Sequence, residues 1–163
     1  MNKLQLAATT KDPDVLDELS QDENSDVHYW VAENPNTSPE TLDVLSRDKD
    51  SDVRCSVAES PNTTPETLEY LSWDVESYVR YNVARNRNTK TETLDVLSRD
   101  VDCGVRGRVA EKPNTKPETL DYLSQDEDAY VRRYVADNPS CSERAYKYIK
   151  GLEILKSLSE VST

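Results

Sequence analysis

The sequence predicts an all-α solenoid of about five repeats, each 26 residues long and built from two short helices. One phrase, VAESPNTTPETLEYLS from Val57, returns almost unchanged from Val31, Val83 and Val109. A fixed period of 20–50 residues is typical of solenoids. Helices this short are not stable alone, so stacked neighbours must bury their apolar faces.

We expect a single repeat domain over residues 1–163, because the chain is long enough for one substantial core. Residues 1–24 are expected to form a partial N-terminal cap repeat, residues 25–140 the repeats, and residues 141–163 a C-terminal capping helix. The five complete units begin at Ser25, Ser51, Ser77, Cys103 and Ala129.

The first helix of each repeat is expected from about Asp26 to Glu33 and at the matching positions of later repeats. Val27, Val31 and Ala32 have the i, i+4, i+5 spacing of one helical face. Acidic and amide side chains favour helix starts. The residues expected there are Asn24, Asp50, Glu76, Asp102 and Asp128.

The second helix is expected to begin with a capping box, in which a Thr and the Glu three residues later bond each other's backbone N–H groups. Leu42 and Leu45, with their counterparts, then give an i, i+3 apolar stripe. The Thr–Glu pairs are Thr37/Glu40, Thr63/Glu66, Thr89/Glu92 and Thr115/Glu118.

At the C-terminal end the repeat phrase breaks, but apolar residues keep a helical spacing. Tyr146 and Ile149 occupy the two Leu positions, and Leu152, Leu155 and Leu158 continue the stripe. We interpret this as one longer helix that covers the open end of the solenoid, with a bend near the helix-weakening Gly151. The alternative is that these leucines bind a partner or a second copy of the chain.

The motif V-R-x-x-V-A-x-N-P-x-T-x-P-E-x-L-x-x-L, as in Val53 to Leu71, resembles the leucine-rich repeat variant family and, more distantly, HEAT repeats. The resemblance implies a right-handed superhelix of paired short helices, with a second helix that is partly 3₁₀. Some family members bind an iron–sulfur centre through an N-terminal cysteine cluster. This chain has no cysteine before Cys55, so no cofactor is expected. Repeat families of this kind mostly bind other macromolecules.

The net charge of −12 is uneven. Residues 1–76 carry 5 Lys/Arg against 18 Asp/Glu, net −13, and residues 77–163 carry 15 against 14, net +1. Such an acidic half repels nucleic acid and anionic lipid surfaces. We expect a cytoplasmic protein without a membrane contact, because neither a signal sequence nor an apolar span is evident. Cys55, Cys103 and Cys141 are then free thiols, and a redox role for them is left open.

An arginine follows the first core valine of most repeats, and an aspartate recurs in the turn before it. We interpret these residues as a structural Asp–Arg ladder, because a buried guanidinium needs a partner. An anion-binding column is the functional alternative. His28 holds the first Arg position and has no evident nucleophile beside it. The ladder residues are Asp48, Arg54, Asp74, Arg80, Asp100, Arg106, Asp126 and Arg132.

No metal site is expected. The acidic run Asp48–Asp52 with Glu59 resembles the ligand spacing of a calcium loop, but Val53 stands where that loop needs glycine. Phosphate loops and nucleophile motifs are also missing from the sequence, which predicts a protein that is not an enzyme.

The leading hypothesis is a non-catalytic scaffold that binds a protein partner and is itself a monomer. Exposed Tyr, Trp and Arg side chains on the second helices are the residue types that anchor interfaces. Alternatively, they only cover gaps between repeats. The candidate contacts are Arg47, Tyr70, Trp73, Arg99 and Tyr122.

A competing hypothesis is a nucleic-acid-binding solenoid that uses a basic region in the third and fourth repeats. Its cations are Arg80, Arg85, Arg87, Lys90, Arg106, Arg108, Lys112 and Lys116. Acidic residues intervene between them, so we rank this hypothesis second. A modest patch for an acidic partner, or for the acidic half of another copy of the chain, is the favoured interpretation of this region.

Overall fold

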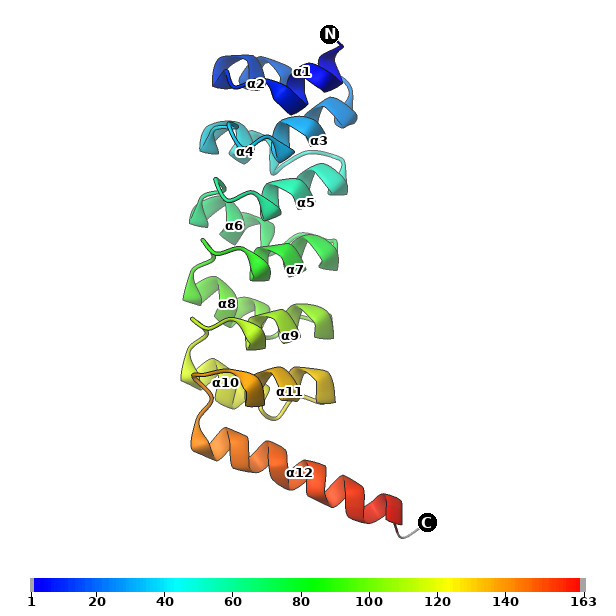
Figure 1. Ribbon diagram of the computed structural model, residues 1–163, viewed down its shortest axis with the longest axis vertical. Helices are drawn as coiled ribbons and strands as arrows, with labels where there is room; N and C mark the ends of the chain where they lie inside the picture. Colours follow the sequence, from blue (N-terminus) through cyan, green and yellow to red (C-terminus); the bar gives the residue numbers. More distant parts are fainter. Residues whose placement is uncertain (1, 162–163) are drawn as a thin grey trace. The chain divides into compact units, whose positions relative to one another are not determined.

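The computed structural model describes residues 2–161, and within this range the chain forms twelve α-helices and no strand (Figure 1). Repeated helix pairs in contact with their neighbours confirm the predicted all-α repeat fold. All the second helices are α-helical, although the resemblance implied partly 3₁₀ geometry. The chain divides into two compact units, an N-terminal unit, Met1–Lys90, and a C-terminal unit, Thr91–Thr163.

The N-terminal unit stacks its first helices in one layer, α1 on α3, α3 on α5 and α5 on α7 (Figure 1). The segment that was expected as a partial cap repeat forms two helices, of which α1 packs on α3. The helices are α1 Lys3–Thr9, α2 Pro13–Leu19, α3 Ser25–Glu33, α4 Pro39–Leu45, α5 Ser51–Glu59, α6 Pro65–Leu71 and α7 Ser77–Arg85.

The C-terminal unit follows the same plan, with α9 packed on α11, and α12 packed on both α10 and α11. Its helices are α8 Thr91–Leu97, α9 Cys103–Glu111, α10 Pro117–Leu123, α11 Ala129–Asp137 and α12 Glu143–Val161. No helix of the described residues is long and apolar enough to cross a membrane.

The core consists of the repeated apolar residues. Val53 and Val57 on α5 and Leu68 and Leu71 on α6 are completely buried, as are their counterparts in most other repeats. One repeat is too thin to enclose these side chains, so each repeat completes the core of its neighbour. This is the physical reason for the repeated phrase.

The predicted capping box is wrong by one residue. The N-cap of α4 is Ser38, whose hydroxyl accepts the Thr41 N–H at 3.1 Å. Thr37 is buried and donates its hydroxyl to the Val31 carbonyl at 2.5 Å, which ties the end of the first helix to the start of the second. The same bond joins Thr63 to Val57, Thr89 to Val83 and Thr115 to Val109.

Buried asparagines at the ends of first helices join adjacent repeats. The Asn86 amide donates to the carbonyls of Ala58 and Ser60, at 2.8 and 2.9 Å. Asn138 bonds the matching carbonyls of the repeat before it, at 2.7 and 2.8 Å. These bonds satisfy carbonyls that the helix ends leave unpaired.

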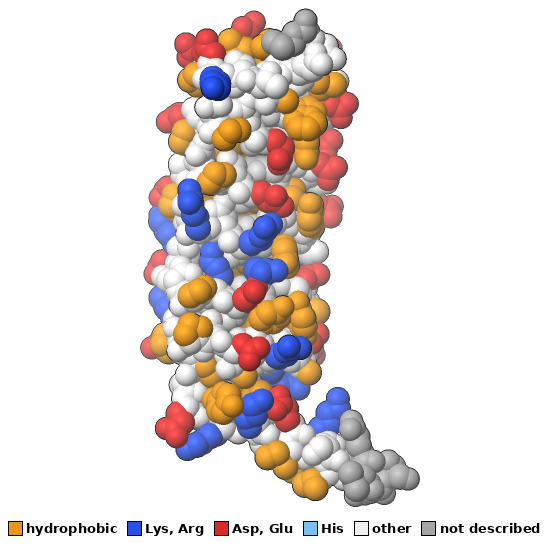
Figure 2. Space-filling model, in the orientation of Figure 1, with side chains coloured by type: hydrophobic (Ala, Val, Ile, Leu, Met, Phe, Trp, Pro, Cys, Tyr) orange, Lys and Arg blue, Asp and Glu red, His pale blue; other side chains and the backbone are white. Residues whose placement is uncertain are grey.

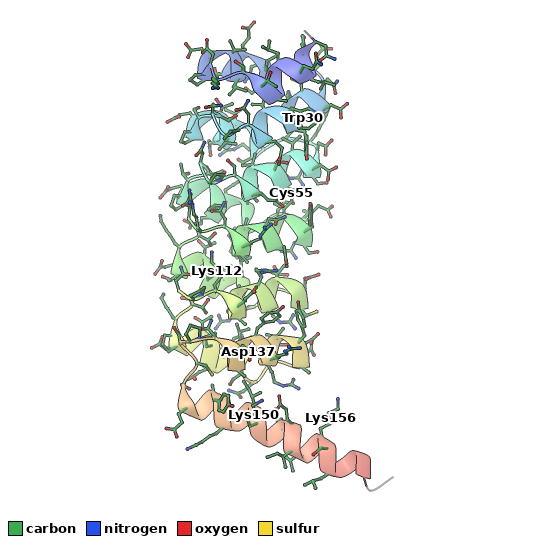
Figure 3. All side chains as sticks on the ribbon, viewed as in Figure 1. Trp30, Cys55, Lys112, Asp137, Lys150 and Lys156 are labelled. Atoms are coloured by element: carbon green, nitrogen blue, oxygen red, sulfur yellow. The ribbon has the colours of Figure 1, made fainter. Side chains whose placement is uncertain are left out.

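The C-terminal helix only partly covers the core. Ala145 and Ile149 are buried, but Tyr146 is half exposed, so its assignment to a buried Leu position is wrong. Beyond Gly151 the helix continues without interruption, and Leu155 is 65% exposed. Figure 3 shows Lys150 and Lys156 along this helix. The first half of α12 therefore covers the last repeat, whereas Ile154, Leu155 and Leu158 further along the helix are exposed.

Candidate partner-binding site

Arg54 and Arg106 each bind the ladder aspartate that lies 20 residues further along the chain, in the turn after the second helix of the same repeat. In the N-terminal unit, Arg54 makes a bidentate pair with Asp74, with Nε–Oδ2 at 2.6 Å and Nη2–Oδ1 at 3.0 Å. Its remaining nitrogen donates to the backbone carbonyl of Asp48 at 2.9 Å. The aspartate before the repeat thus contributes a carbonyl, and the carboxylate comes from the turn that follows the second helix of the same repeat.

The paired groups hold each other in their charged forms. The hydrogen bond that Arg54 donates to the Asp74 carboxylate raises the pKa of Arg54. Burial raises the pKa of Asp74, but the Arg54 hydrogen bond, the Glu76 N–H and the charges of Arg54 and Arg80 outweigh it and lower that pKa below its usual range. We propose a structural role for this chelated, charge-neutral pair.

The C-terminal unit repeats this geometry. Arg106 binds Asp126 at 2.7 and 2.9 Å and the Asp100 carbonyl at 2.8 Å. Arg132 donates to the carbonyls of Asp126 and Glu127, at 2.5 and 3.0 Å. In the N-terminal unit, Arg80 likewise donates to the Asp74 carbonyl at 2.6 Å.

The first positions of the ladder carry substitutes. His28 Nδ1 lies 2.6 Å from Asp48, in the place of an arginine, and Lys3 pairs with Asp22. The other imidazole nitrogen, His28 Nε2, is buried without a hydrogen-bond partner. Among the described residues, no group of three His, Cys, Asp or Glu side chains could hold a metal ion.

The candidate partner contacts form stacked Arg–Tyr pairs. In the N-terminal unit, the Arg47 guanidinium lies 4.8 Å from the centre of the Tyr70 ring and also pairs with Asp43 at 2.9 Å. Tyr70 is 50% exposed and Trp73 is 73% exposed. These side chains border a hollow of about 430 Å³ together with Val75 and the ladder residues Asp48, Arg54 and Asp74.

The C-terminal unit has an equivalent hollow, two repeats further along the sequence. Arg99 lies 4.8 Å from the Tyr122 ring centre, and both border a space of about 370 Å³. Gln125 takes the place of Trp73, and the remaining lining residues are Asp100, Arg106, Asp126 and Glu127. Each of these two hollows is therefore lined both by ladder residues and by candidate contacts.

A second hollow in the C-terminal unit contains a residue that the sequence reading missed. About 330 Å³ in volume, it shares Tyr122 and Gln125 with the first and adds Tyr148 and Arg144. Arg144 lies where the repeat phrase has already broken, 26 residues after Glu118. Its counterparts in the earlier repeats are glutamates, so the repeat pattern offers no signal for an arginine at this position.

The cations of the proposed basic region are mostly paired with carboxylates. In the N-terminal unit, Lys90 pairs with Glu66 at 2.6 Å, and Arg85 lies 3.9 Å from Glu59. In the C-terminal unit the pairs are Arg106–Asp126, Arg108–Glu111, Lys116–Glu92 and Lys116–Asp95. Lys112 is buried, which lowers its pKa. Figure 2 shows cationic and acidic side chains interspersed on the visible surface.

The three thiols differ in environment. Cys55 is buried, which raises its pKa, and its sulfur accepts the Asn82 amide at 3.0 Å. A hydrogen bond with Cys55 also raises the pKa of Tyr78 to about 12. Cys103 is exposed, and Cys141 is partly buried.

Stacked helix pairs with open hollows on the second-helix side define a helical-repeat protein. No family model matches the sequence, and no curated protein matches it. Among solved structures, the chain is similar to one titled "A leucine-rich repeat variant with a novel repetitive protein structural motif". The two are 21% identical, with a TM-score of 0.42, over 91% of this chain and 79% of that chain. This is the kind of repeat that the Val53–Leu71 motif resembles.

Proposed function

We propose that the chain is a non-catalytic repeat scaffold that binds another protein through the exposed side of its second helices. The observation that carries this proposal is the stacked pair of Arg47 and Tyr70 beside the exposed Trp73, bordering an open hollow. Arg99 and Tyr122 repeat the stacked pair in the C-terminal unit.

The exposure of these residues argues against a role in covering gaps between repeats. Trp73 and the neighbouring Val75 leave most of their surface in water, at 73% and 85% exposure. A tryptophan that sealed a gap would be mostly buried. Rigid aromatic rings next to a guanidinium are the side chains that dominate binding energy at protein interfaces.

The nucleic-acid alternative has less support. Lys and Arg side chains bind a nucleic-acid backbone by neutralising its phosphates, which releases the counterions around them. Most cations of the basic region already have a carboxylate partner, so phosphate binding would first have to break those pairs. The single-domain organisation, cytoplasmic location and monomeric state expected from the sequence belong to the same proposal.

The test is capture of a protein partner from a cell extract by the immobilised chain, compared with a Tyr70→Ala/Trp73→Ala variant. Loss of two interface anchors should weaken binding of the captured protein by about 30-fold or more. Trp30→Ala is the matched control, because Trp30 is an exposed tryptophan on α3, which is the first helix of its repeat and not a second helix (Figure 3). Equal capture by all three proteins, each shown to be folded, would contradict the proposal.

A further inference from the structure

The two hollows of the C-terminal unit form one groove. They share Tyr122 and Gln125 on and after α10, so the groove runs from the end of α8 across α10 to α12. We name it the α10 groove and define it by Arg99, Tyr122, Gln125, Arg144 and Tyr148. Both tyrosine rings are about half exposed.

The guanidiniums of Arg99 and Arg144 lack an acidic partner. Among the residues that the structure describes, no carboxylate lies within ion-pair distance of either. Arg99 makes only a long contact, 3.4 Å, with the Asp95 carbonyl and stacks on Tyr122. Its counterpart Arg47, by contrast, is paired with Asp43.

One substitution between repeats explains this difference. The carboxylate that would match Arg99 is Asp95, which pairs instead with Lys116 at 2.9 Å and accepts the Thr119 hydroxyl. In the N-terminal unit, the position of Lys116 is held by Thr64, which has no charge to offer. Asp43 therefore pairs with Arg47, whereas Asp95 pairs with Lys116 rather than with Arg99, which borders the groove.

Of the acidic groups along the groove, Asp126 and Asp121 are engaged, whereas Glu127 is 92% exposed and lies 3.9 Å from Arg106. Asp126 binds Arg106 at 2.7 Å, and Asp121 accepts the Ser142 hydroxyl at 2.6 Å. They do not neutralise Arg99 or Arg144, but they make the groove unfavourable for a ligand with a charge on every unit. Sparse carboxylates that reach only the two guanidiniums avoid this repulsion.

We infer that the occupant of the α10 groove is an extended segment of another protein with two Asp or Glu side chains, one bound by Arg99 and one by Arg144. This inference rests on the proposed function. A guanidinium stacked on a ring is held in place, and its planar fork binds a carboxylate bidentately. Apolar side chains of the segment lie on the rings of Tyr122 and Tyr148.

The geometry limits the spacing of the two acids. Arg99 reaches over Tyr122 on α10, and Arg144 lies on the neighbouring α12. Packed helices lie about 8–10 Å apart. An extended chain advances ~3.3 Å per residue, so the acids are about two to four residues apart.

The binding test uses immobilised full-length protein and a pooled mixture of octapeptides, each with two aspartates two, three or four residues apart and random residues elsewhere. An otherwise equal mixture with asparagines is the reference. The native chain should retain the aspartate mixture roughly tenfold better. Arg99→Gln/Arg144→Gln should lose this preference. Arg133→Gln/Lys147→Gln, with the same charge change on exposed residues outside the groove, should keep it.

A further variant tests whether the Lys116–Asp95 pair is what keeps Asp95 from pairing with Arg99, and it leaves the groove lining unchanged. Lys116→Thr copies the N-terminal unit, so Asp95 becomes free to pair with Arg99 and retention of the aspartate mixture should fall severalfold. Equal retention of both mixtures by the native chain would overturn the inference. So would binding of a labelled oligouridylate in place of the peptides, or self-association that the Arg99→Gln/Arg144→Gln variant abolishes.

The outcomes separate this inference from the proposed function. If a captured partner protein binds the native chain and the Arg99→Gln/Arg144→Gln variant equally well, the scaffold proposal stands and the acidic segment is wrong. If the Tyr70→Ala/Trp73→Ala variant also captures it equally, the proposed function fails as well.

Discussion

The ladder predicts a strong energetic coupling between Arg54 and Asp74. Removing one partner of a fully buried ion pair costs about 3–5 kcal/mol, because the remaining charge is left in a poorly solvated site. Here the side chains are 13% and 6% exposed, and Asp74 keeps the Glu76 N–H at 3.0 Å. We therefore expect Arg54→Met to destabilise the chain by about 2–3 kcal/mol.

Adding Asp74→Asn to Arg54→Met should recover part of this loss, because no buried charge remains and the asparagine oxygen still accepts the Glu76 N–H. The coupling free energy of the double-mutant cycle should be about 2 kcal/mol. The assay is urea unfolding of the four proteins, followed by helical circular dichroism.

Arg47 and Asp43 give the matched control cycle. They form the same kind of ion pair at 2.9 Å, but both side chains are about half exposed, so the coupling should not exceed about 0.5 kcal/mol. A coupling between Arg54 and Asp74 as small as that of the control pair would refute the structural role assigned to the ladder.

Other parts of the molecule give four further predictions. Leu71→Ala should cost about 2–5 kcal/mol because Leu71 is fully buried, whereas Val101→Ala, at a 92% exposed side chain, should stay within about 0.5; equal urea midpoints would contradict the core assignment. Since the folded pKa values of Asp74 and Asp126 are lowered, their stabilisation is complete above the unfolded value of about 4 and is lost as the pH falls through the folded values. Melting temperatures below pH 4 should therefore fall less steeply in Asp74→Asn than in the native chain. A thiol reagent should modify the exposed Cys103 at once and Cys55 only on unfolding, and rapid modification of Cys55 in the folded chain would contradict its burial. Deleting residues 151–163 should shift the melting temperature by no more than ~2 °C, because Ala145 and Ile149, the buried apolar residues among those described on α12, precede this segment; a large loss of stability would support the capping hypothesis.

The helix pairs and the core could be predicted because a repeated sequence shows the same apolar pattern several times. Leu68 and Leu71 recur at fixed spacing, so chance matches average out and the buried face is clear. The helix start was less certain, because Thr37 and Ser38 are both hydroxyl residues that could serve as caps. Only the structure shows that the first bonds a carbonyl and the second caps α4.

The ladder and the site were harder to predict for a related reason. Arg54 lies six residues after Asp48 and twenty before Asp74, and the sequence alone cannot choose between these partners. The difference between Arg47 and Arg99 depends on a third residue, Lys116, from the next helix pair. The exposure of Leu155 depends on whether another helix covers it, which helical periodicity does not report.

The direction of the ladder sets a rule for building shorter or longer versions of this chain. The Arg54–Asp74 and Arg106–Asp126 pairs each join the first helix of a repeat to the turn after its second helix, so a cut at the start of α6 or α10 separates an arginine from its acid. An excision of one full period inside the N-terminal unit, such as residues 48–73, would bring His28 to Asp74 in place of Asp48 and would leave no acid stranded. Excisions that are not a whole number of 26-residue periods would shift Arg and Asp out of register. A designed array would also need a cationic side chain that pairs with its first ladder aspartate, as Lys3 pairs with Asp22.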